Sequence, residues 1–230
     1  MTHMQMKLKI LFITFMVATA IQCATKLHAD DSNLQSTRVA SNSGITQDRE
    51  RVPQLIAALG SETEQDVNAQ NDLLNLARSS PENRKVVIDE LILRTKEQLQ
   101  NRQSNQQQVF RFWLSANQVF QKLHATEAIP LLISFISYGD GYAGNGLNHR
   151  PAQDSLFIMG RDAIPSLSEA LSNSPEPLTR MLVADCLGNI GGSEAQVALN
   201  RAKEHETNGD VIRYIDASLA TIAREAARDK

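Results

Sequence analysis

Apolar residues recur at every third or fourth position over most of this chain, which is the spacing of one face of an α-helix. No stretch alternates apolar and polar residues for long enough to predict a β-strand. The pattern therefore predicts an all-α fold of about ten helices. The apolar stripes with helical spacing lie at residues 55–59, 67–77, 88–99, 110–123, 129–137, 155–160, 164–171, 182–190, 195–202 and 211–222.

Local signals predict where several of these helices begin and end. Ser80-Pro81 has the form of a helix start, with serine as the N-cap and proline at the first helical position. Gly60 follows the first apolar stripe, where a glycine commonly ends a helix. The amide-rich stretch 98–108 predicts a turn between two helices.

One phrase of sequence occurs three times near the C-terminal end. The segments Ser155–Gly160, Cys186–Gly191 and Ser218–Ile222 begin 31 and 32 residues apart and carry similar residues in the same order. A repeat of this length is typical of stacked supersecondary units. Helix pairs in tandem, joined by short turns, would form an α-solenoid.

These residues resemble the HEAT repeat, in its short bacterial form that is also called PBS-lyase-like. The resemblance is carried by Ala163–Leu171, by Arg180 early in the next helix, and by Leu187–Gly191. It implies a superhelix of antiparallel helix pairs over residues 50–230, with well-matched repeats at 125–222. Phe157 departs from the pattern, because a glycine is usual there, and Glu194–Val197 lacks the usual proline.

The N-terminus has the pattern of an export signal over residues 1–24. Lys7 and Lys9 precede an apolar run from Ile10 to Ile21, which is too short to span a bilayer. Cleavage of this signal would place the protein in the periplasm or outside the cell. An uncleaved anchor, or a lipid attached to Cys23, is an alternative.

Residues 25–49 are predicted to be a disordered leader, because they contain few large apolar side chains. The formal net charge is −3, and no cluster of Lys and Arg stands out. This composition argues against a nucleic-acid partner. Aromatic residues make up only 5% of the chain. Their main concentration lies around Trp113, where we expect core packing, with a patch that anchors a partner as the alternative.

The segment 138–150 is the candidate binding loop. It is rich in glycine and interrupts the repeat, so it is predicted to be either an elongated connector or a recognition loop. In the second case the contact residues would be Tyr138, Asp140, Tyr142, Asn145, His149 and Arg150.

Two other interpretations of this loop are disfavoured by its residues. It contains Gly139, Gly141 and Gly144 in G-x-G-x-x-G spacing, but Gly146 and Pro151 would break the helix that a dinucleotide site needs after the third glycine. The segment before it begins with Ile-Pro and is predicted to be a helix, not a strand. Asp140 and the asparagines lack the spacing of a calcium loop.

Arg150, Arg180 and Arg213 fall at near-equivalent places in successive repeats. They could form a basic ladder for an acidic partner, but pairing with acidic residues of a neighbouring repeat, such as Asp154 or Asp185, is favoured. The other histidines, His124 and His205, are isolated, so no metal site is predicted.

No catalytic motif and no cofactor site is predicted from these residues. The sequence favours an exported, non-catalytic scaffold that binds another protein, built from HEAT-like repeats. The alternative is a small-molecule-binding or lyase-type protein that uses the loop at 138–150, since some relatives with this repeat attach bilins. A lipoprotein that assists assembly at a membrane is a third possibility.

Overall fold

A computed structural model describes residues 50–62, 64–102, 105–139 and 150–228, which all belong to one unit that begins at Arg49. The described residues are helical or in turns, and none of them forms a strand. Besides a helical segment at 50–57, the elements are α2 (Glu64–Ser79), α3 (Pro81–Gln100), α4 (Gln106–Leu123), η1 (Thr126–Ala128), α5 (Ile129–Ser134), α6 (Pro151–Met159), η2 (Gly160–Ala163), α7 (Ile164–Asn173), α8 (Pro177–Ile190), α9 (Gly192–Lys203) and α10 (Gly209–Arg228).

A serine side chain caps α3 at the place that the sequence predicts, and an asparagine side chain, for which no cap is predicted, caps α4. The Ser80 hydroxyl accepts a hydrogen bond from Asn83 N at 3.1 Å, at the start of α3. The Asn105 side chain accepts one from Gln108 N at 3.2 Å, at the start of α4. Each bond satisfies a backbone N–H that has no partner within the helix. The amide-rich segment between them is therefore a break between two helices.

The two Ile-Pro pairs, at 129–130 and 164–165, have the same local structure. Ile129 and Ile164 each follow a short 3₁₀ turn, η1 or η2, and each opens an α-helix with proline at its second residue. The corresponding segment Glu194–Val197 lacks the proline. Helix α9, which contains this segment, begins at Gly192 with no 3₁₀ turn described before it. Helix α9, which lacks the proline, therefore also starts differently from α5 and α7, which have it.

Two of the predicted stripes differ from the structure in detail. Val67 is 57% exposed, so it does not share the buried face of α2, which carries Leu73 and Leu74 instead. Helix α5 ends at Ser134, before the predicted end near Ser137. Beyond it the backbone tightens, and Tyr138 N donates to Phe135 O at 2.9 Å in a four-residue turn.

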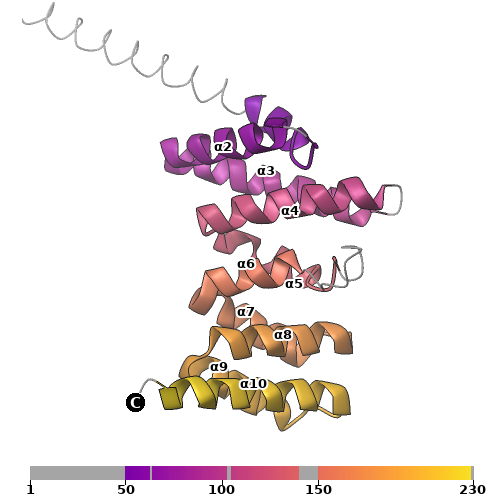
Figure 1. Cartoon of the computed structure of the whole chain (residues 1–230), viewed down its shortest axis with the longest axis vertical. Helices are drawn as coiled ribbons and strands as arrows, with labels where there is room; N and C mark the ends of the chain where they lie inside the picture. Colours follow the sequence, from indigo (N-terminus) through magenta and orange to yellow (C-terminus); the bar gives the residue numbers. More distant parts are fainter. Residues whose placement is uncertain (1–49, 63, 103–104, 140–149, 229–230) are drawn as a thin grey trace, which may run out of the picture. The chain divides into compact units, whose positions relative to one another are not determined.

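The helices pack in two rows (Figure 1). In one row α2, α4, α6, α8 and α10 each pack on the next even-numbered helix, and in the other row α5 packs on α7 and α7 on α9. The two rows share one apolar core, in which Trp113 and Phe120 are fully buried, as their pattern predicts. Of the described helices, none is long and apolar enough to cross a membrane.

Polar contacts link neighbouring helices of the even-numbered row. The Ser115 hydroxyl of α4 donates to Asp66 Oδ2 of α2 at 3.0 Å. Ser155 Oγ of α6 lies 2.6 Å from Asn117 Oδ1 of α4, and both residues are buried. Gln153 Nε2 of α6 donates to Asp185 Oδ2 of α8 at 3.2 Å. A buried polar group that lacks a hydrogen-bond partner is costly. These contacts therefore favour the one register between the helices in which the hydrogen bonds can form.

Candidate functional site

Most of the residues predicted to form the binding loop lie outside the described residues. Asp140, Tyr142, Asn145 and His149 are among them. The two that remain, Tyr138 and Arg150, stand at opposite ends of the segment, and each is half-buried.

Tyr138 packs against its own protein. Its ring meets the ring of Phe110 edge to face, with 6.2 Å between the ring centroids. The guanidinium carbon of Arg102 lies 5.8 Å from the Tyr138 centroid, within the range of a cation–π contact. Tyr138 therefore joins the turn after α5 to the start of α4 and the end of α3.

Arg150 precedes the first turn of α6. Its Nη1 lies 3.4 Å from Gln153 Oε1, at the long limit of a hydrogen bond. Gln153 in turn donates to Asp185 of the next helix in the row. Arg150 thus belongs to a set of hydrogen-bonded side chains that connects α6 and α8.

Arg180 forms an ion pair with an acidic residue outside its own helix, as predicted, but the partner is a different one. Arg180 of α8 binds Glu206, in the turn between α9 and α10, and not Asp154 or Asp185. Arg213 pairs with Asp210 on its own helix. These contacts depend on which turn lies beside which helix, and a residue spacing does not specify that.

Glycine at position 188 allows α8 and α10 to approach closely. A Cβ atom there would lie 2.6 Å from Ser218 Cβ and 2.9 Å from Ser218 Cα, closer than atoms can pack. At this point the backbone of α8 therefore packs directly against the Cα and Cβ atoms of Ser218 on α10. Phe157, which stands at the equivalent place in α6, is 54% exposed.

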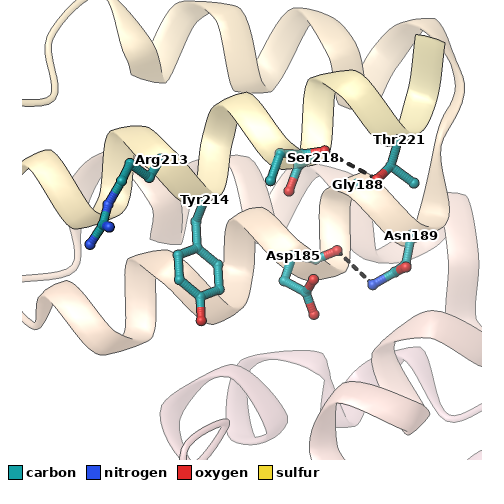
Figure 2. Close-up of a pocket in the computed structure, with 8 residues that line it drawn as sticks. Asp185, Gly188, Asn189, Arg213, Tyr214, Ser218 and Thr221 are labelled. Atoms are coloured by element: carbon teal, nitrogen blue, oxygen red, sulfur yellow. Dashed lines mark hydrogen bonds between the residues drawn. The ribbon is translucent and has the colours of Figure 1, made fainter. Parts of the chain in front are cut away.

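A groove of about 330 Å³ follows this contact along α8 and α10 (Figure 2). Small residues and exposed polar side chains of both helices form it. The lining residues are Asp185, Gly188, Asn189, Arg213, Tyr214, Ala217, Ser218 and Thr221.

The sequence patterns do not predict a site at this groove. They point to Asp185 only as a partner for an arginine, and they do not single out Asn189 or Tyr214. A signal for it exists in hindsight: Gly188 lies in mid-helix, where glycine is unfavourable unless close packing requires it, and Tyr214 lies on the polar side of α10.

The buried cysteine is not a nucleophile at neutral pH. Burial, reinforced by the neighbouring Asp185 carboxylate, raises the pKa of the Cys186 thiol to about 12. A thiol with this pKa is almost entirely protonated, and the thiolate is the reactive form. Cys186 therefore acts as a small apolar core residue.

His124 has a structural role at the end of α4. It adopts the left-handed conformation with φ of 47°, and its Nε2 lies 2.9 Å from Asp162 Oδ2. Among the described residues, no group of three or more His, Cys, Asp and Glu side chains is placed to hold a metal ion.

Comparison with known proteins identifies no relative. No protein-family profile matches the chain, and neither a curated protein nor a solved structure does.

Proposed function

We propose that this chain is an exported, non-catalytic binding protein in which HEAT-like helix pairs form an α-solenoid that holds another protein. Support for the solenoid comes from the two rows of helices and from the 31- and 32-residue spacing of the repeated phrase. In such an arrangement each unit buries its apolar face against its neighbours and leaves long helix surfaces for a partner.

The observation that carries a binding function is the groove between α8 and α10. It is partly open to solvent, and small residues line it together with polar side chains and Tyr214, which is 44% exposed. Tyrosine provides a large contact area at a small cost in side-chain entropy, and it is enriched at protein interfaces. An open groove suits a segment of a partner protein better than a reaction that must exclude water.

A pair of matched substitutions on α10 tests this function. Ala217 lines the groove, and Ala220 is exposed on the same helix but does not line it. Ala217→Gln should fill the groove with a longer side chain, whereas Ala220→Gln should leave it open. Both changes keep a residue that favours helix.

The measurement is photo-crosslinking from a residue beside the groove in living cells, with the crosslinked protein identified by mass spectrometry. The proposal expects one partner that the wild type and Ala220→Gln both recover and that Ala217→Gln loses. Equal recovery by all three, or no crosslinked partner in any of them, would refute it.

Export rests on the sequence of residues 1–24. Lys7 and Lys9 before the Ile10–Ile21 run support a cleaved signal, and Cys23 leaves lipidation as the alternative. The intact mass of the purified mature chain separates the outcomes. A free N-terminus after a small residue supports cleavage, a diacylglycerol adduct on Cys23 supports a lipid anchor, and an unprocessed chain contradicts both.

A further inference from the structure

The floor of the α8/α10 groove suits a chain of methylene groups. Gly188 contributes no side chain, and Ala217 and Ser218 contribute only short ones. Short side chains and backbone therefore form part of the lining, and carbon atoms make up much of it. A flexible, mostly aliphatic side chain can lie along such a surface while its polar end reaches a partner.

The acceptors of the groove lie along α8. Asp185 is half-buried, accepts one hydrogen bond from Gln153 Nε2, and forms no ion pair within the described part of the chain. One turn later, Asn189 Nδ2 donates to Asp185 O at 3.0 Å, which leaves the Asn189 side-chain oxygen as an acceptor on the exposed side of the helix. A carboxylate and an amide oxygen one helical turn apart can both accept from one planar donor group.

An aromatic side chain of α10 lines the same groove as these acceptors. Figure 2 shows Tyr214 between Arg213 and Asp185, with the tyrosine ring and the Asp185 carboxylate pointing to the same side. The quadrupole of an exposed tyrosine ring attracts a cation that lies above it. Guanidinium groups make this contact most often, because they also stack on the ring.

The charge balance of the groove favours a cation. Arg213 points away from Asp185 in Figure 2, and it is paired with Asp210. The Asp185 carboxylate is therefore the charge that lacks an opposite partner among the lining residues. An apolar side chain would desolvate this carboxylate without compensation, and an anion would be repelled by it.

We infer that the α8/α10 groove binds an arginine side chain of the partner protein, with Asp185 and Asn189 accepting from the guanidinium and Tyr214 stacking on it. This inference rests on the proposed function and adds the chemistry of the partner. The aliphatic part of the arginine would lie over Gly188 and Ala217.

The test uses a minimal ligand and the ¹⁵N-labelled full chain. Acetyl-Gly-Arg-Gly-amide is titrated while the backbone amide signals are recorded by NMR. The same peptide with citrulline in place of arginine is the control, because citrulline keeps the shape and loses the charge. The inference expects saturable shifts at residues 185–189 and 213–218 with the arginine peptide, and at least tenfold weaker binding of citrulline. Equal affinity for the two peptides, or shifts spread over other helices, would overturn it.

Matched variants locate the effect in named side chains. Asp185→Asn keeps an acceptor for Gln153 but removes the charge, and should weaken arginine binding about tenfold. Glu169→Gln removes an exposed carboxylate of α7 that does not line the groove, and should leave binding unchanged. Tyr214→Phe should retain the stacking contact and Tyr214→Leu should lose it. Unchanged binding by Asp185→Asn would contradict the inference, and the citrulline comparison decides it if that variant does not fold.

Failure of this inference and failure of the proposed function give different results. If Ala217→Gln loses a protein partner and Asp185→Asn keeps it, the groove binds a protein by other chemistry. If the arginine peptide binds as expected and no protein partner is crosslinked, the groove chemistry stands and the proposed function is wrong.

Discussion

Arg180 and Glu206 form a bidentate ion pair that links α8 to the turn between α9 and α10. Arg180 Nε lies 2.7 Å from Glu206 Oε2, and Nη2 lies 3.0 Å from Oε1. The arginine also donates to Ser174 O at 2.8 Å, and the carboxylate accepts from the backbone N–H of Asn208 at 2.9 Å. The two side chains are only 14% and 8% exposed, so this pair is a structural link and not part of a basic surface.

Removing the charge of Glu206 should therefore destabilise the fold. Glu206→Gln leaves Arg180 largely buried without its counter-ion, and we expect a loss of about 2 kcal/mol in the free energy of unfolding at pH 7. Urea denaturation measures it. Glu169→Gln, on the surface of α7, should change the free energy of unfolding by less than about 0.5 kcal/mol. An equal effect of the two changes would contradict the structural role of the pair.

The stabilisation by Glu206 should also depend on pH. The hydrogen bond from Arg180 holds the pKa of Glu206 below its ordinary value of 4.5, although burial opposes this. The unfolded state therefore binds more protons at acid pH, and the stabilisation is complete above the ordinary pKa and is lost as the pH falls through the folded pKa. The difference in unfolding free energy between wild type and Glu206→Gln should shrink from pH 7 to pH 3. A constant difference would show that Glu206 does not titrate in this way.

Gly188→Ala should loosen the contact between α8 and α10. Its new Cβ would overlap Ser218 Cβ, and the helices would have to separate. We expect a net loss of about 1–2 kcal/mol, since overpacking outweighs the gain of about 1 kcal/mol in helix propensity. Adding Ser218→Gly should restore part of the stability. Gly209→Ala, where no atom lies within 4 Å of the added Cβ, is the control and should be near neutral.

Ser155→Ala should cost about 1–3 kcal/mol. Its hydroxyl is 2.6 Å from Asn117 Oδ1 and accepts from Gln121 Nε2 at 3.0 Å. Its loss leaves the buried Asn117 oxygen and the half-buried Gln121 amide of α4 without this partner. Ser172 makes only a hydrogen bond to Ser168 O on the surface of its own helix, and Ser172→Ala should have little effect. Thermal unfolding followed by the fluorescence of Trp113, the single tryptophan, compares the two variants. If they unfold at the same temperature, the Ser155 contact does not stabilise the fold.

Cys186 should resist alkylation in the folded protein. The pKa of about 12 that burial imposes leaves very little thiolate at pH 8. Iodoacetamide should label Cys186 slowly without denaturant and completely in urea, as measured by mass spectrometry of the peptide that contains it. Rapid labelling under native conditions would mean that the end of α8 opens to solvent.

The helical character of this protein, the N-cap at Ser80 and the burial of Trp113 could all be predicted from the sequence. Each of these depends on residues within one helix or one turn, because the spacing of apolar side chains shows which face of a helix is buried. The exposure of Val67 marks the limit of this argument, since an apolar residue beside a stripe need not face the core.

Which residues of different helices meet depends on how the helices pack in three dimensions. Arg180 binds Glu206 because the turn after α9 lies beside the start of α8, and Tyr138 packs on Phe110 because the end of α5 lies beside the start of α4. The groove at Gly188 likewise exists because α10 is the helix that packs on α8, at a register that places Ser218 against the glycine. A helical pattern records only the rotation of each helix, whereas these contacts depend on the distance and register between helices.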